Sequence, residues 1–169
     1  MLVLIDLTKL YFAVKDLRVH VDYKSLVNFV KEEYEEVDEE DIRFEAYTMY
    51  NGNNVGQVKF IENLESLGMK VVRQPFGKNA NFSIDIAARA MEEESKEILV
   101  ISNDPDLSRL FPILRRGDKQ PTLCFFSERL GEGFYPEIIA GDVEFIDLSH
   151  PEIKHQITGR GDLLTMEQR

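Results

Sequence analysis

Short apolar runs and amphipathic stretches alternate along most of this 169-residue chain. Runs of Val, Ile, Leu and aromatic residues bounded by polar residues predict strands, and apolar residues at helical spacing predict helices. One helical stripe runs from Val58 to Leu67 and ends at Gly68, a residue typical of helix ends. The pattern predicts strands at Leu2–Ile5, Ile42–Tyr47, Lys70–Arg73, Ile98–Ile101, Pro121–Phe126 and Val143–Leu148. It predicts helices at Asp22–Glu35, Val55–Leu67, from Asn81 or Ser83 to Glu94, and at Asp106–Leu114.

The order of these elements predicts an α/β fold. Strands separated by helices of this length favour a three-layer α/β/α sandwich with a mostly parallel central sheet and helices on both faces. A chain of 19.6 kDa is large enough for one domain with its own core. We expect this domain at residues 1–148, followed by a polar C-terminal tail at residues 149–169 that frays or docks loosely.

The composition of the chain indicates its cellular compartment and restricts the kinds of molecule that it can bind. The chain has 31 acidic and 20 basic residues and a net charge of −11, which opposes non-specific adhesion to polyanions. A nucleic-acid substrate would therefore need a local basic groove or bridging metal ions. The single cysteine, Cys124, lies in an apolar run and excludes a disulfide within the chain, which fits a reducing compartment. Because no apolar run is long enough to span a bilayer, we expect a cytoplasmic protein without a membrane partner.

Acidic residues follow two of the predicted strands. Asp6 ends the first strand, and Asp104 and Asp106 follow the strand Ile98–Ile101 at the start of a helix. The carboxyl ends of parallel strands meet at one edge of a sheet, where open α/β folds place ligands. Carboxylates gathered there repel one another and favour a hard divalent cation such as Mg²⁺ or Mn²⁺. Asp85, in the first turns of a predicted helix, is a fourth candidate catalytic and metal-binding residue. Asp104 and Asp106 could instead cap a helix, and Asp85 could stabilise the start of its own helix.

Polar and basic residues close to these acids are candidates for binding a substrate. Cations there could contact an RNA backbone, and hydroxyl and amide groups could hydrogen-bond a phosphate or a water, although each could also be an ordinary surface residue. Tyr11, Tyr47 and Tyr50 could stack on unpaired bases or pack in the core. The histidines have no metal-ligand spacing and receive no role. The candidate substrate-binding residues are Lys9, Lys78, Asn81, Ser102, Asn103 and Arg109.

The ordered motifs of the chain resemble an NYN domain, of the PIN-like group of Mg²⁺-dependent ribonucleases. The similarity extends from Leu2 to Leu148 and is carried by VLIDLTKLYFA, EAYTMYNGNN, LGMKVVRQP, the helix around Asp85, VISNDPDLSRL and VEFIDL. The resemblance implies that Asp6 and Asp104 are core acids, that Asp106 is an accessory acid and that the helix near Asp85 contributes another. It also implies divalent-metal-dependent hydrolysis of single-stranded or structured RNA.

Two departures from the family pattern leave alternatives open. Leu7 and Lys9 stand where family members usually have Gly and Asn, and Lys9 adds a positive charge at the site. The helical acid is Asp85 in one alignment, whereas in another Asn81 takes its place. A catalytically degenerate PIN-like scaffold that binds RNA or a protein partner is therefore the main alternative. A Toprim-type phosphotransfer domain, suggested by the Asp-Pro-Asp motif alone, is a further one, and self-association stays open.

Overall fold

A computed structural model describes residues 1–76 and 81–160 of the chain. The predicted substrate-binding residue Lys78 lies outside these ranges. Within them the strands are β1 (Leu2–Asp6), β2 (Val19–Val21), β3 (Arg43–Tyr50), β4 (Met69–Pro75), β5 (Glu97–Ile101), β6 (Gln120–Phe125), β7 (Glu144–Asp147) and β8 (Thr158–Arg160). The helices are α1 (Leu7–Leu17), α2 (Tyr23–Glu33), α3 (Val55–Ser66), α4 (Phe82–Glu92), α5 (Leu110–Arg116), α6 (Tyr135–Ala140) and α7 (Pro151–Ile157).

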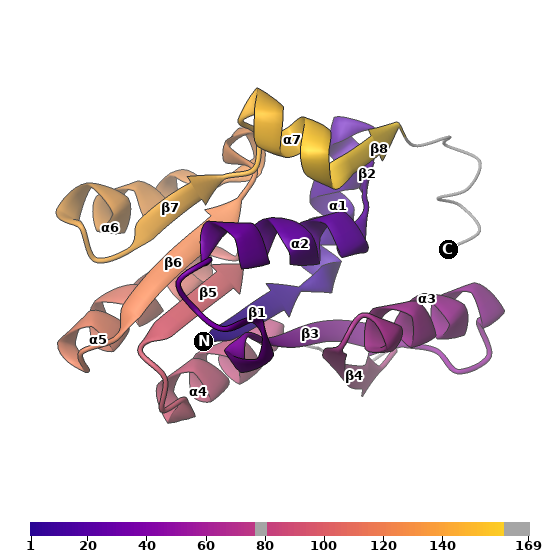
Figure 1. Cartoon of the computed structure of the whole chain (residues 1–169), viewed down its shortest axis with the longest axis horizontal. Coiled ribbons are helices and arrows are strands. Elements are labelled where there is room, and N and C mark those ends of the chain that lie inside the picture. Colours follow the sequence, from indigo (N-terminus) through magenta and orange to yellow (C-terminus); the bar gives the residue numbers. More distant parts are fainter. Residues whose placement is uncertain (77–80, 161–169) are drawn as a thin grey trace.

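The central feature of the described chain is a six-stranded parallel sheet in the order β4-β3-β1-β5-β6-β7 (Figure 1). Its middle strand, β1, is fully buried and pairs with β3 on one side and β5 on the other. Such a strand faces helices on both sides, which explains why its sequence is a continuous apolar run rather than an alternating one. The predicted parallel α/β sandwich is confirmed.

Helices cover both faces of this sheet (Figure 1). On one face, α2 lies beside α3, where the rings of Tyr23 and Phe60 are 5.4 Å apart, and α7 packs against α2. On the other face, α4 contacts both β1 and α5. The chain changes face where it leaves the outer strand β4 and crosses back to β5. This crossing brings β5, and the acids that follow it, next to β1.

Helix α1 is the main element that the sequence reading did not predict. Its buried residues Leu7, Leu10, Ala13 and Val14 have helical spacing, but the helix begins directly after β1 without a Gly or Pro to mark the change. The predicted helix at Asp106–Leu114 is instead a 3-10 helix, η2 (Pro105–Arg109), followed by α5. Other boundaries differ from the predictions by one to a few residues.

The first part of the expected C-terminal tail is folded. Residues 151–157 form α7, which packs on α2, and β8 pairs antiparallel with β2. Ile157 is buried, and its carbonyl oxygen accepts a hydrogen bond from the Asp22 N–H at 2.8 Å. These contacts differ from the expectation of loose docking. Residues 161–169 lie outside the described part of the chain.

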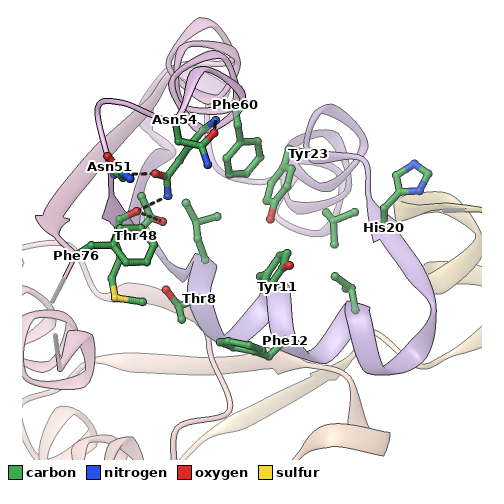
Figure 2. Close-up of a pocket in the computed structure, with 15 residues that line it drawn as sticks. Thr8, Tyr11, Phe12, His20, Tyr23, Thr48, Asn51, Asn54, Phe60 and Phe76 are labelled. Atoms are coloured by element: carbon green, nitrogen blue, oxygen red, sulfur yellow. Dashed lines mark hydrogen bonds between the residues drawn. The ribbon is translucent and has the colours of Figure 1, made fainter. Parts of the chain in front are cut away.

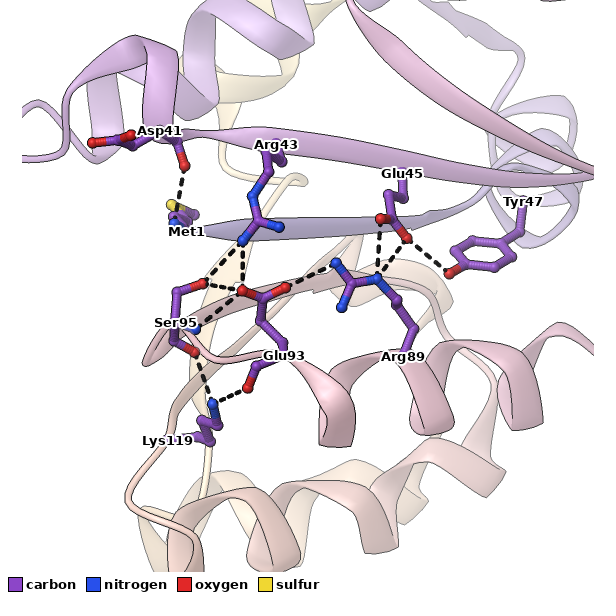
Figure 3. Close-up of polar contacts among 9 residues, drawn as sticks. All are labelled: Met1, Asp41, Arg43, Glu45, Tyr47, Arg89, Glu93, Ser95 and Lys119. Atoms are coloured by element: carbon purple, nitrogen blue, oxygen red, sulfur yellow. Dashed lines mark hydrogen bonds and ion pairs between the residues drawn. The ribbon is translucent and has the colours of Figure 1, made fainter.

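A buried polar network fastens α4 to the sheet (Figure 3). The Arg89 guanidinium on α4 pairs with Glu45 of β3 at 3.0 Å and with Glu93 at 2.8 Å. Glu93 also accepts hydrogen bonds from Arg43 of β3 at 2.5 Å and from the Ser95 hydroxyl at 2.7 Å. Burial alone would raise the pKa of Glu93, but its hydrogen bonds outweigh that effect and hold the pKa well below its ordinary value.

The network ends at Tyr47, also on β3. The Tyr47 hydroxyl donates to Glu45 at 3.3 Å, and its ring lies 6.2 Å from that of Phe82 at the start of α4. Burial, followed by the negative charge of Glu45, raises the pKa of Tyr47. Charge pairing at one end of α4 and ring packing at the other therefore fix this helix, which carries Asp85, on the sheet.

Candidate active site

The fold brings Asp6 and Asp104 together. Asp6 ends β1 and Asp104 follows β5, and these two strands are parallel neighbours at the centre of the sheet. Each aspartate also caps the helix after it, since Asp6 accepts a hydrogen bond from the Lys9 N–H at 3.0 Å and Asp104 from the Asp106 N–H at 3.1 Å. The capping bonds fix each carboxylate at the carboxyl edge of the sheet.

Ser102 connects the two aspartates. Its hydroxyl is fully buried, donates to the Asp6 carboxylate at 3.5 Å and accepts from the Asp104 N–H at 3.2 Å. The serine therefore fixes the turn after β5 relative to the end of β1. Its interactions are with the acids, so the predicted contact of Ser102 with a substrate stays a prediction.

Asp6 is a buried carboxylate without a close cationic partner. It is 1% exposed, and no ion pair joins it to any residue in the described ranges. Burial, with a contribution from the charge of Asp104, raises its pKa, and this outweighs the opposing effects of the Lys9 N–H and ammonium. A carboxylate in these surroundings gains from a nearby cation.

Among the described residues, Lys9 is the side-chain cation that lies within ion-pair distance of one of these acids. Its ammonium nitrogen lies 3.8 Å from an Asp104 carboxylate oxygen, and the lysine side chain is 41% exposed whereas that of Asp104 is 16% exposed. The sequence reading placed Lys9 on a substrate phosphate, but in this structure it faces an acid of the site. Because the Lys9 side chain is partly in water, solvent screens part of the attraction and the pair is weaker than a buried one.

The other two predicted acids do not form a group with Asp6 and Asp104 that could hold a metal ion among the described residues. Asp85 lies on α4, where its carboxylate accepts a hydrogen bond from the Gln74 amide of β4 at 2.7 Å. Asp106 is exposed in η2. Among residues 1–76 and 81–160, no three His, Cys, Asp or Glu side chains are grouped so that they could hold a metal ion. The roles of all four acids as catalytic groups and ligands stay predictions.

The donors at the site nevertheless fit a hard cation. Mg²⁺ is often held by only one or two carboxylates, with waters and substrate phosphates completing its coordination. Asp6 and Asp104 supply two carboxylates from neighbouring strands, and Asp6 is buried without an ion pair to any residue that the structure describes. The pair therefore suits Mg²⁺ or Mn²⁺ at a site that a substrate would complete.

The remaining predicted binding residues have mainly structural contacts. The Asn81 side chain caps α4 by accepting from the Ser83 N–H at 3.1 Å, and the Asn103 amide donates to the Arg129 carbonyl oxygen at 2.8 Å. Arg109 is exposed at the end of η2. The sequence reading missed Gln74 as the partner of Asp85. Gln74 lies one residue beyond the predicted strand Lys70–Arg73, and the approach of β4 to α4 could not be predicted.

Comparison with known proteins identifies the family. The model of the NYN domain matches residues 1–149, which bears out the resemblance found in the sequence. A crystal structure of a protein of unknown function from Vibrio parahaemolyticus has the same fold, with a TM-score of 0.69 at 20% identity. The similarity covers 86% of this chain and 91% of that one, and at such identity it establishes the fold alone. No curated protein matches the sequence. The chain therefore belongs to the NYN domain family, a family with a PIN-like nuclease fold.

Proposed function

We propose that this NYN domain is an endoribonuclease that uses Mg²⁺ or Mn²⁺ to hydrolyse RNA phosphodiester bonds at Asp6 and Asp104. The observation that carries the proposal is the convergence of these carboxylates from adjacent parallel strands, at the sheet edge where α/β folds bind ligands. Family membership supports the same chemistry, since PIN-like nucleases depend on divalent metals. The described helices include none long and apolar enough to cross a membrane.

In this proposal, each residue of the site has a role in the reaction. Asp6 and Asp104 would hold the cation, which when bound supplies charge neutralisation at the scissile phosphate and a more acidic water. Ser102 keeps the Asp6 carboxylate oriented through its hydroxyl. Asp106, exposed beside Asp104, accepts a proton or orients water at the rim, and Asp85 contributes a further carboxylate from α4. The Lys9 ammonium moves from Asp104 to a substrate phosphate.

The ion pair between Lys9 and Asp104 favours a second candidate function. If the Lys9 ammonium stays beside Asp104, its positive charge opposes the binding of a metal cation there. The protein would then bind RNA without cleaving it. The family usually has an asparagine at this position. If Lys9 competes with the cation in this way, Lys9→Asn should raise the apparent metal affinity and the cleavage rate, whereas a Lys9 that contacts a substrate phosphate predicts slower cleavage in this variant.

The test is incubation of single-stranded and hairpin RNA with the protein and Mg²⁺ or Mn²⁺, beside a chelator control. We expect cleavage that falls at least about a hundredfold in Asp6→Asn and Asp104→Asn, because loss of a cation-binding carboxylate removes a group that acts in the transition state. Asp16→Asn changes an exposed acid on α1 in the same way and should leave the rate unchanged. Cleavage that persists in both site variants would refute the proposal. RNA binding without turnover in the parent would establish the scaffold instead, and cleavage gained by Lys9→Asn would identify Lys9 as its cause.

A further inference from the structure

An open pocket lies beside the acid pair, between α1, α2 and α3 (Figure 2). Its volume is about 400 Å³, within the range of sites that bind small molecules. Leu7 and Thr8, which directly follow Asp6, form one end of it, and Thr48 and Met49 at the end of β3 form part of its wall. The pocket and the acid pair therefore meet at the beginning of α1.

Aromatic rings surround this pocket. Figure 2 shows Tyr11 and Phe12 on α1, Tyr23 on α2, Phe60 on α3, and Phe76 after β4. Phe12 and Phe76 are 55% and 57% exposed, although side chains of this type are usually buried. Exposed rings beside a cavity offer flat apolar faces on which another ring can stack.

Amide groups of the β3–α3 connection complete the wall. The side-chain oxygen of Asn54 accepts from the Gln57 N–H at 3.1 Å, and that of Asn51 accepts from the Asn53 N–H at 3.1 Å. These bonds orient both amides and leave their NH₂ groups without a hydrogen-bond partner in residues 1–76 and 81–160. The pocket thus combines aromatic faces with fixed donors, a combination that suits a flat ligand with acceptor atoms on its edge.

The lining of the pocket lacks the acidic residues that give this protein its negative charge. The chain carries 31 acidic residues, yet none of the residues lining the pocket is Asp or Glu. The Lys15 ammonium on α1 lies 6.0 Å from the Tyr11 ring. The Arg73 guanidinium on β4, which pairs with Glu65, lies 5.5 Å from the Tyr50 ring. A polyanion would meet much less repulsion here than the net charge of −11 implies.

We infer that this pocket binds an unpaired nucleobase of a single-stranded RNA whose backbone passes the acid pair, an inference that rests on the proposed function. The base stacks on the exposed rings of Phe12 and Phe76, and the Asn51 and Asn54 amides donate to acceptors on its edge. A duplex would keep its bases stacked and paired, so the pocket selects single-stranded segments. An aliphatic side chain of a protein partner would use the apolar wall but not the oriented amides.

The test is binding of a short single-stranded oligoribonucleotide that contains 2-aminopurine, a base whose fluorescence falls when it stacks. Measurements in a chelator without divalent metal separate binding from cleavage. For the parent protein we expect quenching of 2-aminopurine, and for Phe12→Ala and Phe76→Ala a loss of quenching and a Kd raised about tenfold each, the effect of losing a stacked base. Both rings are more than half exposed, so these variants should fold normally, as far-ultraviolet circular dichroism can check.

Ile139→Ala is the matched control. It shortens an apolar side chain that is 84% exposed on α6, at the opposite end of the sheet from α3 (Figure 1), and should leave the Kd unchanged. Equal affinity and quenching in the parent, Phe12→Ala and Phe76→Ala would overturn the inference, as would equal affinity for duplex RNA or no binding of RNA by the parent. Quenched binding that both variants lose, without any cleavage on addition of metal, would refute the proposed nuclease while the base pocket stands.

Discussion

Substitution of Glu93 tests the network that holds α4. Glu93→Gln keeps the shape of the side chain but removes the charge that faces Arg43 and Arg89. Breaking a buried ion pair costs about 3–5 kcal/mol, because the remaining partner loses its compensation. Here the Glu93 side chain is 4% exposed, but Arg43 is half exposed and Arg89 keeps its ion pair with Glu45. We therefore expect Glu93→Gln to lower the free energy of unfolding by about 2–3 kcal/mol at neutral pH.

The dependence on pH distinguishes a lost charge from a general packing defect. The pKa of Glu93 in the folded protein is below its ordinary value of 4.5, so its charge contributes stability that is complete above that value. This contribution is lost as the pH falls towards the lower folded pKa. The difference in stability between the parent and Glu93→Gln should therefore be largest at neutral pH and shrink in acid.

Urea unfolding followed by circular dichroism measures this difference at several pH values. Glu92→Gln is the matched control, since Glu92 is the exposed neighbour of Glu93, and its cost should be within about 0.5 kcal/mol. A cost for Glu93→Gln below about 1 kcal/mol at neutral pH, or a difference that stays constant as the pH falls, would refute the reasoning.

Two further predictions concern other parts of the fold. Asp22→Ala removes the carboxylate that accepts the Lys24 and Ser25 N–H groups at the start of α2, and urea unfolding should show a loss of about 1 kcal/mol, whereas equal stability to the parent would contradict the capping role. Cys124 is fully buried in β6 and burial raises the pKa of its thiol, so a disulfide reagent should modify it only at the rate of unfolding; rapid modification of the native protein would contradict this.

The elements that were predicted correctly have strong local signals. Strand β1 is a continuous apolar run, and α3 has a regular apolar stripe that ends before Gly68. By contrast α1 follows β1 without an interruption, so its apolar residues were not separated from those of the strand. The fold of residues 151–160 depends on contacts with α2 and β2, more than a hundred residues earlier, for which the local sequence holds no signal.

Part of the candidate site could be predicted, because it depends on where strands end. The position of Asp6 and Asp104 follows from where two strands end and from the rule that parallel strands align their carboxyl ends. The partners of Lys9 and Asp85 could not be predicted, because they depend on the directions of side chains on different elements. The same holds for the pocket beside α1. Of the aromatic rings of the pocket, only Tyr11 is a stacking candidate from the sequence.

The place of β1 in the sheet has a consequence for how the chain matures. Among the six strands of the sheet, β1 is synthesised before the others, and its two partner strands begin at Arg43 and Glu97. Until β5 has been synthesised, the apolar segment Leu2–Ile5 lacks one of its two partner strands and stays exposed to chaperones or to aggregation. A ribosome-bound nascent chain that stops before residue 97 should therefore be far more sensitive to protease than one that extends past β6.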